Sequence, residues 1–208
     1  MDGAWVDRLE RRFGFLAVPG LPGLLTAMTA AAALFAASKP EFVGALALDP
    51  DALLHGQVWR ALTFLIVPPR SSVLWMLLWL AMIFAVLSAL EAAWGEFKLT
   101  VFLAIGVVMS TAAALLTGAP GDNGPVHLAN FLAFARLAPD REVLVLFVIP
   151  VKLRWVAAVA AALTAIQLLG GDNGSRVRLL AGLSAYLLYF APGHWLDIKQ
   201  AWRRRGQR

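Results

Sequence analysis

The sequence predicts an all-α polytopic membrane protein with six transmembrane helices, a long interfacial first loop and a short fourth helix. Three observations lead to this fold class. The chain has 208 residues, of which 60% are hydrophobic and only 15% are charged, a composition that few soluble domains share. It contains long uncharged runs of the length that a membrane span requires. One apolar segment between two such runs is too short to cross.

The six membrane segments follow from apolar runs that end at turn residues or charges. In order along the chain they are Leu21–Ser38, Ser71–Leu90, Leu99–Thr117, Pro125–Ala138, Leu153–Leu169 and Leu179–Phe190. The membrane domain therefore covers residues 21–192. An interfacial segment at residues 1–20 precedes it, and a basic, amphipathic tail at residues 193–208 follows it.

The first twenty residues allow two interpretations. Trp5, Leu9 and Phe13 recur at helical spacing, opposite Arg8 and Arg12. This pattern is typical of a short amphipathic helix at the membrane surface. A disordered basic tail is the alternative.

The first loop, Glu41–Arg70, mixes polar turns with apolar runs that are too short to cross a bilayer. Its part Leu53–Val67 is predicted to form helical pieces in the membrane interface, with Trp59 at the depth of the headgroups. Arg60 follows Trp59 directly and is expected to bond carbonyl groups of the loop.

The fourth segment, Pro125–Ala138, would span roughly 21 Å as a helix, whereas a bilayer core is about 30 Å thick. One end must therefore begin below the lipid surface. Non-helical backbone at that depth survives only inside protein or beside a water-filled cavity. The approach Gly121–Gly124 is thus predicted to border a pocket.

The basic residues give the expected orientation. Six spans place both termini on one side, and of the 18 lysines and arginines only five fall on the other side, namely Lys39, Arg60, Arg70, Arg176 and Arg178. The positive-inside rule then predicts cytoplasmic N- and C-termini, and we expect a bacterial inner membrane. The basic pI is interpreted as a topology signal and a contact with anionic lipid of the bilayer, not as a nucleic-acid surface.

The sequence Gly-Asp-Asn-Gly occurs twice, at Gly121–Gly124 and Gly171–Gly174, in both cases on the side opposite the termini. These residues favour tight turns because they tolerate a positive φ. A calcium loop is the alternative, although each copy has one carboxylate and no further run of ligands. With no cysteine and three scattered histidines, the sequence predicts neither a metal site nor a cofactor.

Four stretches resemble one known family. They are Gly56–Thr63 with its Trp-Arg pair, Leu90-Glu91 before a turn at Gly95, Ala138-Pro139 after the short helix, and Phe147–Trp155 before the fifth span. Their order and spacing over residues 20–192 are similar to those of the rhomboid superfamily. The resemblance implies a rhomboid-like six-helix bundle.

Active rhomboids are intramembrane serine proteases, and the resemblance shows where their catalytic groups would lie. The family's serine position falls near Gly124 and its histidine position near Leu179. The positions of a second histidine and an asparagine on the second helix hold Trp75 and Trp79. None of these four groups is present. Moreover, residues 118–163 contain no Ser, Thr, Cys or Tyr, and residues 176–190 contain no His.

Two other functions stay open. A relocated serine protease could use Ser184 with His127, the sharpest pair among the remaining candidates, which also include Asn130, Ser110 and Thr111. His55 and His194 are interpreted as interfacial. A small-molecule transporter is the second alternative, but the spans Ser71–Leu90 and Leu99–Thr117 carry no ionisable group at mid-membrane.

The favoured interpretation is a pseudoprotease, similar in kind to the derlins, that binds or handles other membrane proteins. Close packing of the fourth and sixth helices is expected from small residues four apart, at Ala129 and Ala133 and at Ala181 and Ala185.

Overall fold

The computed structural model describes residues 4–145 and 149–205, and it is mostly helical. Side chains are described for residues 5–143 and 150–190. Phe147 and Val148, which carry part of the family resemblance, therefore lie outside the described residues. The same holds for the side chains of His194 and of the basic tail.

Four helices are long and apolar enough to cross a membrane. They are α2 (Leu21–Ser38), α6 (Val73–Trp94), α7 (Glu96–Thr117) and α9 (Leu153–Gly170). The predicted fourth and sixth segments correspond to α8 (Gly124–Leu137) and α10 (Asn173–Arg205), which do not meet that criterion over the described residues. The chain is thus a helical membrane protein with four candidate spans.

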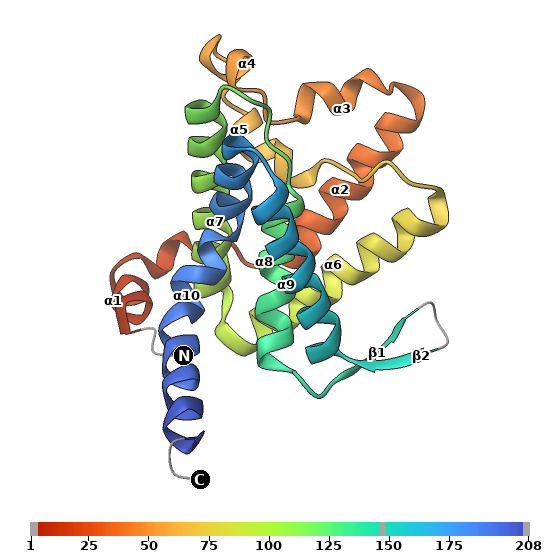
Figure 1. Cartoon of the computed structure of the whole chain (residues 1–208). Coiled ribbons are helices and arrows are strands. Elements are labelled where there is room, and N and C mark those ends of the chain that lie inside the picture. Colours follow the sequence, from red (N-terminus) through yellow and green to blue (C-terminus); the bar gives the residue numbers. More distant parts are fainter. Residues whose placement is uncertain (1–3, 146–148, 206–208) are drawn as a thin grey trace.

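The last helix differs from the prediction at both ends. It begins at Asn173 rather than Leu179, because the Asp172 carboxylate accepts hydrogen bonds from the N–H groups of Gly174 (3.0 Å) and Ser175 (3.3 Å). It then continues through Pro192 to Arg205. The backbone therefore has no break at residue 192, and the helix projects beyond the bundle towards the C-terminus (Figure 1).

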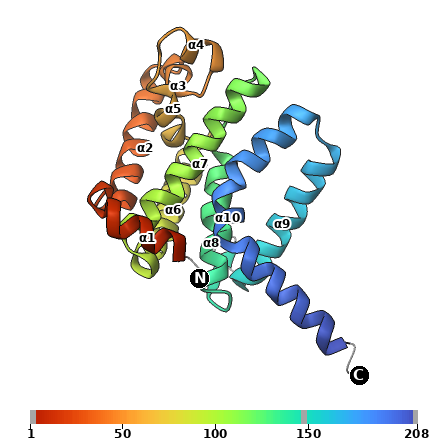
Figure 2. The same ribbon diagram turned by 90° about the vertical axis from the view of Figure 1, so that its left-hand side faces the viewer.

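The helices α7 and α10 form the centre of the bundle. They pack against each other, α8 packs on both and also contacts α6 and α9, and α2 packs on α6 (Figures 1 and 2). The fully buried side chains near this centre include Phe102, Leu99, Leu87, Leu90 and Ala129. The outer faces of α6 and α9 expose large apolar side chains, as expected for surfaces in contact with lipid.

The first loop folds into short helices at the end of the bundle opposite the termini (Figure 2). These are α3 (Glu41–Leu46), α4 (Pro50–Leu54), α5 (Arg60–Thr63) and the 3₁₀ turn η2 (Phe64–Ile66). Helical pieces were expected and are present, whereas the position of Leu53–Val67 in the membrane interface stays a prediction. The side chains of η2 are no more than 7% exposed and belong to the protein core. Burial of three consecutive large apolar side chains against neighbouring helices such as α2 is favourable, because it removes apolar surface from water.

A β-hairpin, which was not predicted, joins α8 to α9. The strands β1 (Glu142–Val145) and β2 (Ile149–Lys152) pair antiparallel, with Glu142 opposite Lys152. At its base, the carboxylate of Asp140 lies 3.2 Å from Arg154 and 3.8 Å from Lys152. These exposed ion pairs contribute little to stability.

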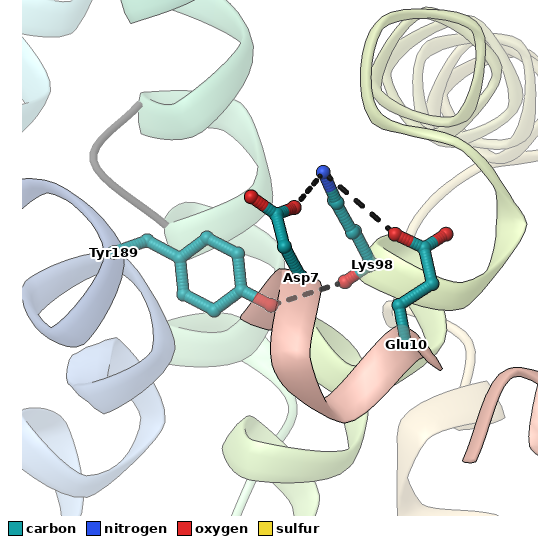
Figure 3. A network of polar contacts seen from close by, with 4 residues as sticks. All are labelled: Asp7, Glu10, Lys98 and Tyr189. Carbon is teal, nitrogen blue, oxygen red and sulfur yellow. Dashed lines mark hydrogen bonds and ion pairs between the residues drawn. The ribbon is translucent and has the colours of Figure 1, made fainter. Parts of the chain in front are cut away.

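The N-terminal segment forms the helix α1 (Ala4–Phe13) and the turn η1 (Gly14–Leu16), so the helical alternative describes it correctly. One face of α1 is docked on the bundle. Val6 is 1% exposed, and the ring of Trp5 meets that of Tyr189 edge to face at 5.5 Å. Figure 3 shows the polar part of this contact: Lys98 lies 2.6 Å from Asp7 and 3.8 Å from Glu10.

Candidate functional site

Arg60 and Trp59 hold the first loop together. Arg60 is 8% exposed, and its guanidinium donates hydrogen bonds to the carbonyl groups of Gly44 and Ala47 (2.8 Å for the latter) and to the side-chain oxygen of Gln57 (2.8 Å). The indole of Trp59, which is half exposed, donates to the carbonyl of Ala45 at 3.3 Å. The two side chains therefore donate hydrogen bonds to carbonyl groups at the end of α3 that have no partner within the helix.

Polar side chains fix the start of α8 against this loop. Asn123 donates hydrogen bonds to the carbonyl groups of Leu65 (3.1 Å) and Val67 (2.9 Å). The N–H of Gly121 donates to the carbonyl of Leu48 at 2.9 Å, and the Leu48 side chain is fully buried. The helix α8 thus begins beside the first loop, while a start below the lipid surface stays a prediction.

The two Gly-Asp-Asn-Gly turns use their aspartates in the same way. Asp122 accepts a hydrogen bond from the N–H of Gly124 at 2.8 Å, just as Asp172 accepts one from Gly174 at 3.0 Å. Each carboxylate therefore satisfies an N–H group at the beginning of a helix, α8 or α10. The repeat is a pair of helix starts, and none of its four glycines has the positive φ for which tight turns were expected there.

A cavity of about 590 Å³ opens where α9 ends and α8 and α10 begin. Its lining combines charged, polar and apolar residues: Asp122, Gly124, Pro125, Leu128, Gln167, Gly171, Ser175, Arg178 and Leu179. Its size falls within the range of about 300–1,000 Å³ that ligand sites occupy.

The cavity brings together the two positions at which the rhomboid resemblance would place a serine and a histidine. Gly124 and Leu179 both line it, although they are far apart in the sequence. A Cβ atom on Gly124 would lie only 2.8 Å from the carboxylate of Asp122, so the turn itself favours glycine there. Ser175 supplies a hydroxyl, but it donates to the carbonyl of Asp172 at 2.9 Å, and no histidine lines the cavity among the described residues.

The two tryptophans at the other family positions lie on α6. Trp75 is 55% exposed on the outer face of the helix. Trp79 is turned towards α8, where its ring meets that of His127 edge to face at 5.4 Å. Neither residue lines the cavity, and an indole ring has no acceptor that could take up a proton.

The pair proposed for a relocated protease is not joined by a hydrogen bond. His127 is half-buried, and its Nε2 lies 3.3 Å from the carbonyl of Leu65, which assigns it a partner in the first loop. The hydroxyl of Ser184 is buried and has no hydrogen-bond partner among the described residues. A serine without a base is a weak nucleophile.

Asn130 lies one turn beyond His127 and is 2% exposed, with neither atom of its amide hydrogen-bonded among the described residues. Both residues border a small cavity of about 10 Å³ between α6 and α8. The hydroxyl of Thr111 is likewise buried without a partner in the described part of the chain. Ser110 is buried in α7, and His55 is exposed in the first loop, where its Nδ1 lies 2.7 Å from the carbonyl of Asp51.

The contact between α8 and α10 contains the four small residues singled out in the sequence. Ala129, Ala133, Ala181 and Ala185 are all buried. The two helices also approach closely at Gly182, where an added Cβ would overlap the ring of Pro125 and lie 3.2 Å from its backbone. Sequence reasoning overlooked Gly182 because a lone glycine after Ala181 carries no signal beyond its small size.

Three further residues of the site were also overlooked. Ser175 and Arg178 were missed because α10 was expected to start after them, and Gln167 was missed because its place in the cavity depends on how α9 and α10 meet. The aspartate at the second Gly-Asp-Asn-Gly turn is the one signal that could have indicated the earlier start. No cluster of three or more potential metal ligands occurs in the residues that the structure describes.

Comparison with known proteins gives one match. The family model described as "Eukaryotic integral membrane protein (DUF1751)" matches residues 20–119, which cover α2, the first loop, α6 and α7. All residues that line the cavity lie beyond the end of this match. No curated protein and no solved structure matches the chain.

This match corrects one prediction. A bacterial inner membrane was expected from the sequence, whereas the matching family is described as eukaryotic. The expectation was wrong because composition and charge distribution indicate insertion into a bilayer but do not distinguish a bacterial membrane from a eukaryotic one. Integral membrane character is supported by the match and by the four candidate spans.

Proposed function

We propose that this protein is a rhomboid-like pseudoprotease that binds other integral membrane proteins. The observation that supports the proposal is the cavity between α8, α9 and α10. Gly124 and Leu179 line it together, at the positions where the resemblance would put a nucleophile and a base. A cavity of this size with a glycine and a leucine at those positions is suited to binding rather than to acyl transfer.

The proposal includes a six-helix bundle. The helix α8 has 14 residues and a length of about 21 Å, whereas α6 and α7, with 22 residues each, reach about 33 Å. In a six-helix arrangement α8 is surrounded by longer helices and need not cross by itself. The helix α10, with 33 residues, has ample length for one crossing of roughly 30 Å.

The surface for a membrane partner is formed by α6 and α9 on either side of α8. Both helices contact α8, which lies between them (Figure 2). On α6 the side chains of Val73, Leu74 and Leu77 are at least 59% exposed, and on α9 the same holds for Val159 and Ile166. A transmembrane segment approaching in the plane of the membrane would meet these faces first.

Site-specific photo-crosslinking tests this proposal. A benzophenone amino acid is placed at Leu77 on α6 or Val159 on α9. The control position is Leu34 on α2, whose side chain is 74% exposed. We expect discrete adducts with integral membrane proteins from the first two positions and not from Leu34. Equal labelling of bulk lipid at all three positions would contradict a binding role for α6 and α9.

The protease alternative requires Ser184 and His127 to act together. They lie on different helices, and His127 is engaged by Leu65 instead. No observation favours it over binding.

A further inference from the structure

The cavity contains two opposite charges that do not pair with each other. Arg178 and Asp122 both line it, yet no ion pair joins them and no side-chain hydrogen bond of Arg178 occurs within the described residues. The carboxylate of Asp122 accepts one backbone N–H, from Gly124, which leaves most of its acceptor sites free.

Two other arginines, Arg60 and Arg176, behave differently. Arg60 bonds the carbonyl groups of Gly44 and Ala47, and Arg176, only two residues from Arg178, donates to the carbonyl groups of Leu168 (2.7 Å) and Leu169 (2.9 Å). The hydrogen-bond donors of these guanidinium groups thus have partners within the protein. Arg178 is half-buried beside Gly174 and donates no side-chain hydrogen bond within the described residues. Its guanidinium is therefore available to an external anion.

The backbone around the cavity also favours an anionic group near Arg178. The helices α8 and α10 both begin at its wall, at Gly124 and Asn173. The first turns of helices carry partial positive charge and free N–H groups. The Asp172 carboxylate near Gly174 already accepts two of those N–H groups, so its acceptor capacity is partly used.

Part of the lining is apolar and continues onto the outside of the bundle. Pro125, Leu128 and Leu179 form the apolar wall of the cavity. Just beyond it, Leu169 of α9 and Leu180 of α10 are 79% and 45% exposed. A ligand of the cavity is therefore expected to be charged at one end and apolar at the other, which is the chemistry of a lipid.

We infer that the cavity binds the headgroup of a zwitterionic phospholipid, with its phosphate on Arg178 and its ammonium group on Asp122. A guanidinium suits a phosphate oxygen pair, and a carboxylate suits an ammonium. A purely anionic headgroup fits less well, because Asp122 would face it without a cation. Gln167, which is exposed on α9, adds amide groups at the same wall.

Native mass spectrometry of the full-length protein in detergent tests this inference. The protein is titrated with dioleoyl phosphatidylethanolamine and dioleoyl phosphatidylglycerol in competition, so that headgroup charge is the difference between the two lipids. The wild type is expected to retain one phosphatidylethanolamine in preference to phosphatidylglycerol. Equal retention of both lipids would overturn the zwitterionic site.

Two variants assign the roles of the charges. Arg178→Gln should weaken phosphatidylethanolamine binding about tenfold or more, the loss typical of a charge-assisted hydrogen bond. Arg70→Gln, which removes an exposed arginine before α6, is the matched control and should not change it. Asp122→Asn keeps an oxygen for the N–H of Gly124 and should abolish the preference over phosphatidylglycerol. Unchanged binding in Arg178→Gln would refute the inference.

Two further experiments cover a misfolded Arg178→Gln variant and distinguish a lipid from its soluble headgroup. Should Arg178→Gln fail to fold, Gln167→Glu places a negative charge at the cavity wall on an exposed position, and it must weaken binding of the phosphate if the inference holds. Glycerophosphoethanolamine, which has the same headgroup without acyl chains, should compete poorly. Equal competition by this soluble compound would overturn the assignment of a lipid as the ligand.

Discussion

Arg60 is a buried cation that carbonyl groups, rather than a carboxylate, hold in place. Its guanidinium joins Gly44 and Ala47 at the end of α3 to Gln57 before α5. The first loop in turn accepts hydrogen bonds from the start of α8 at the carbonyl groups of Leu48 and Leu65. The Arg60 side chain therefore stabilises both the first loop and the start of α8.

We expect Arg60→Ala to lower the melting temperature of the protein in detergent. Losing hydrogen bonds of a buried charged group costs roughly 1.5–3 kcal/mol, and the carbonyl groups would be left without partners. Thermal unfolding followed by circular dichroism measures the effect. Arg70→Ala, at an exposed arginine, is the control and should be close to neutral; equal melting temperatures for Arg60→Ala and wild type would contradict the role.

Gly182 sets the distance between α8 and α10. An added Cβ would overlap Pro125, so Gly182→Ala should separate the helices and cost about 1–3 kcal/mol, as overpacking commonly does. Gly23→Ala in α2, where an added Cβ meets no atom within 4 Å, is the matched control. Urea or thermal unfolding of the two variants side by side compares them, and equal stabilities would show that the helices tolerate the methyl group.

At the scale of elements, α1 is attached to the bundle by an ion pair as well as by Val6. The side-chain hydrogen bond from Lys98 holds the pKa of Asp7 below its usual value of 3.8. A carboxylate with a lowered folded-state pKa stabilises the docked state above its unfolded-state pKa and loses that contribution as the pH falls through the folded-state pKa.

Asp7→Asn should therefore loosen α1 near neutral pH but not in acid. Backbone hydrogen exchange of residues 4–13, measured by mass spectrometry with both proteins at the same pH, is expected to be faster in Asp7→Asn at about pH 7, and the difference is expected to shrink as the pH falls below 3.8. Glu10→Gln is the control, since Glu10 lies farther from Lys98 and should have the smaller effect. A difference that persists in acid would mean that the ion pair is not its cause.

The bounds of most helices could be predicted because turn residues and charges end the apolar runs. Lys39-Pro40 ends α2, and Gly118 ends α7 with a positive φ of 64°. The hairpin β1–β2 could not be predicted, because an apolar run of that length is also consistent with a helix. The burial of Phe64–Ile66 was overlooked for a similar reason: composition cannot tell a side chain in lipid from one in a protein core.

The site was partly predictable from sequence as well. The resemblance supplied Gly124 and Leu179, and the structure places both at one cavity. Arg178 and Gln167 could not be inferred, because their place in the cavity depends on how α9 and α10 meet. Hydrogen bonds such as that from Asn123 to Val67 join residues far apart in the sequence, and no local pattern encodes them.

For the whole molecule, the proposed six-helix bundle predicts that both termini lie on the same side of the membrane and the first loop on the other. The two ends of the chain lie at the same end of the structure, opposite α3 and α4 (Figure 1). Compartment-specific reporters fused at either terminus and inserted between Asp49 and Pro50 test this arrangement. Termini in different compartments would contradict the six-helix bundle.

The most direct test of the central claim, binding without proteolysis, is a paired assay on purified protein. A fluorophosphonate probe reports an activated serine, and cleavage of a rhomboid transmembrane substrate reports turnover. We predict no labelling and an intact substrate for wild type, Ser184→Ala and Ser175→Ala alike. Labelling and cleavage that occur in wild type but disappear in either serine variant would contradict the pseudoprotease and establish a relocated nucleophile.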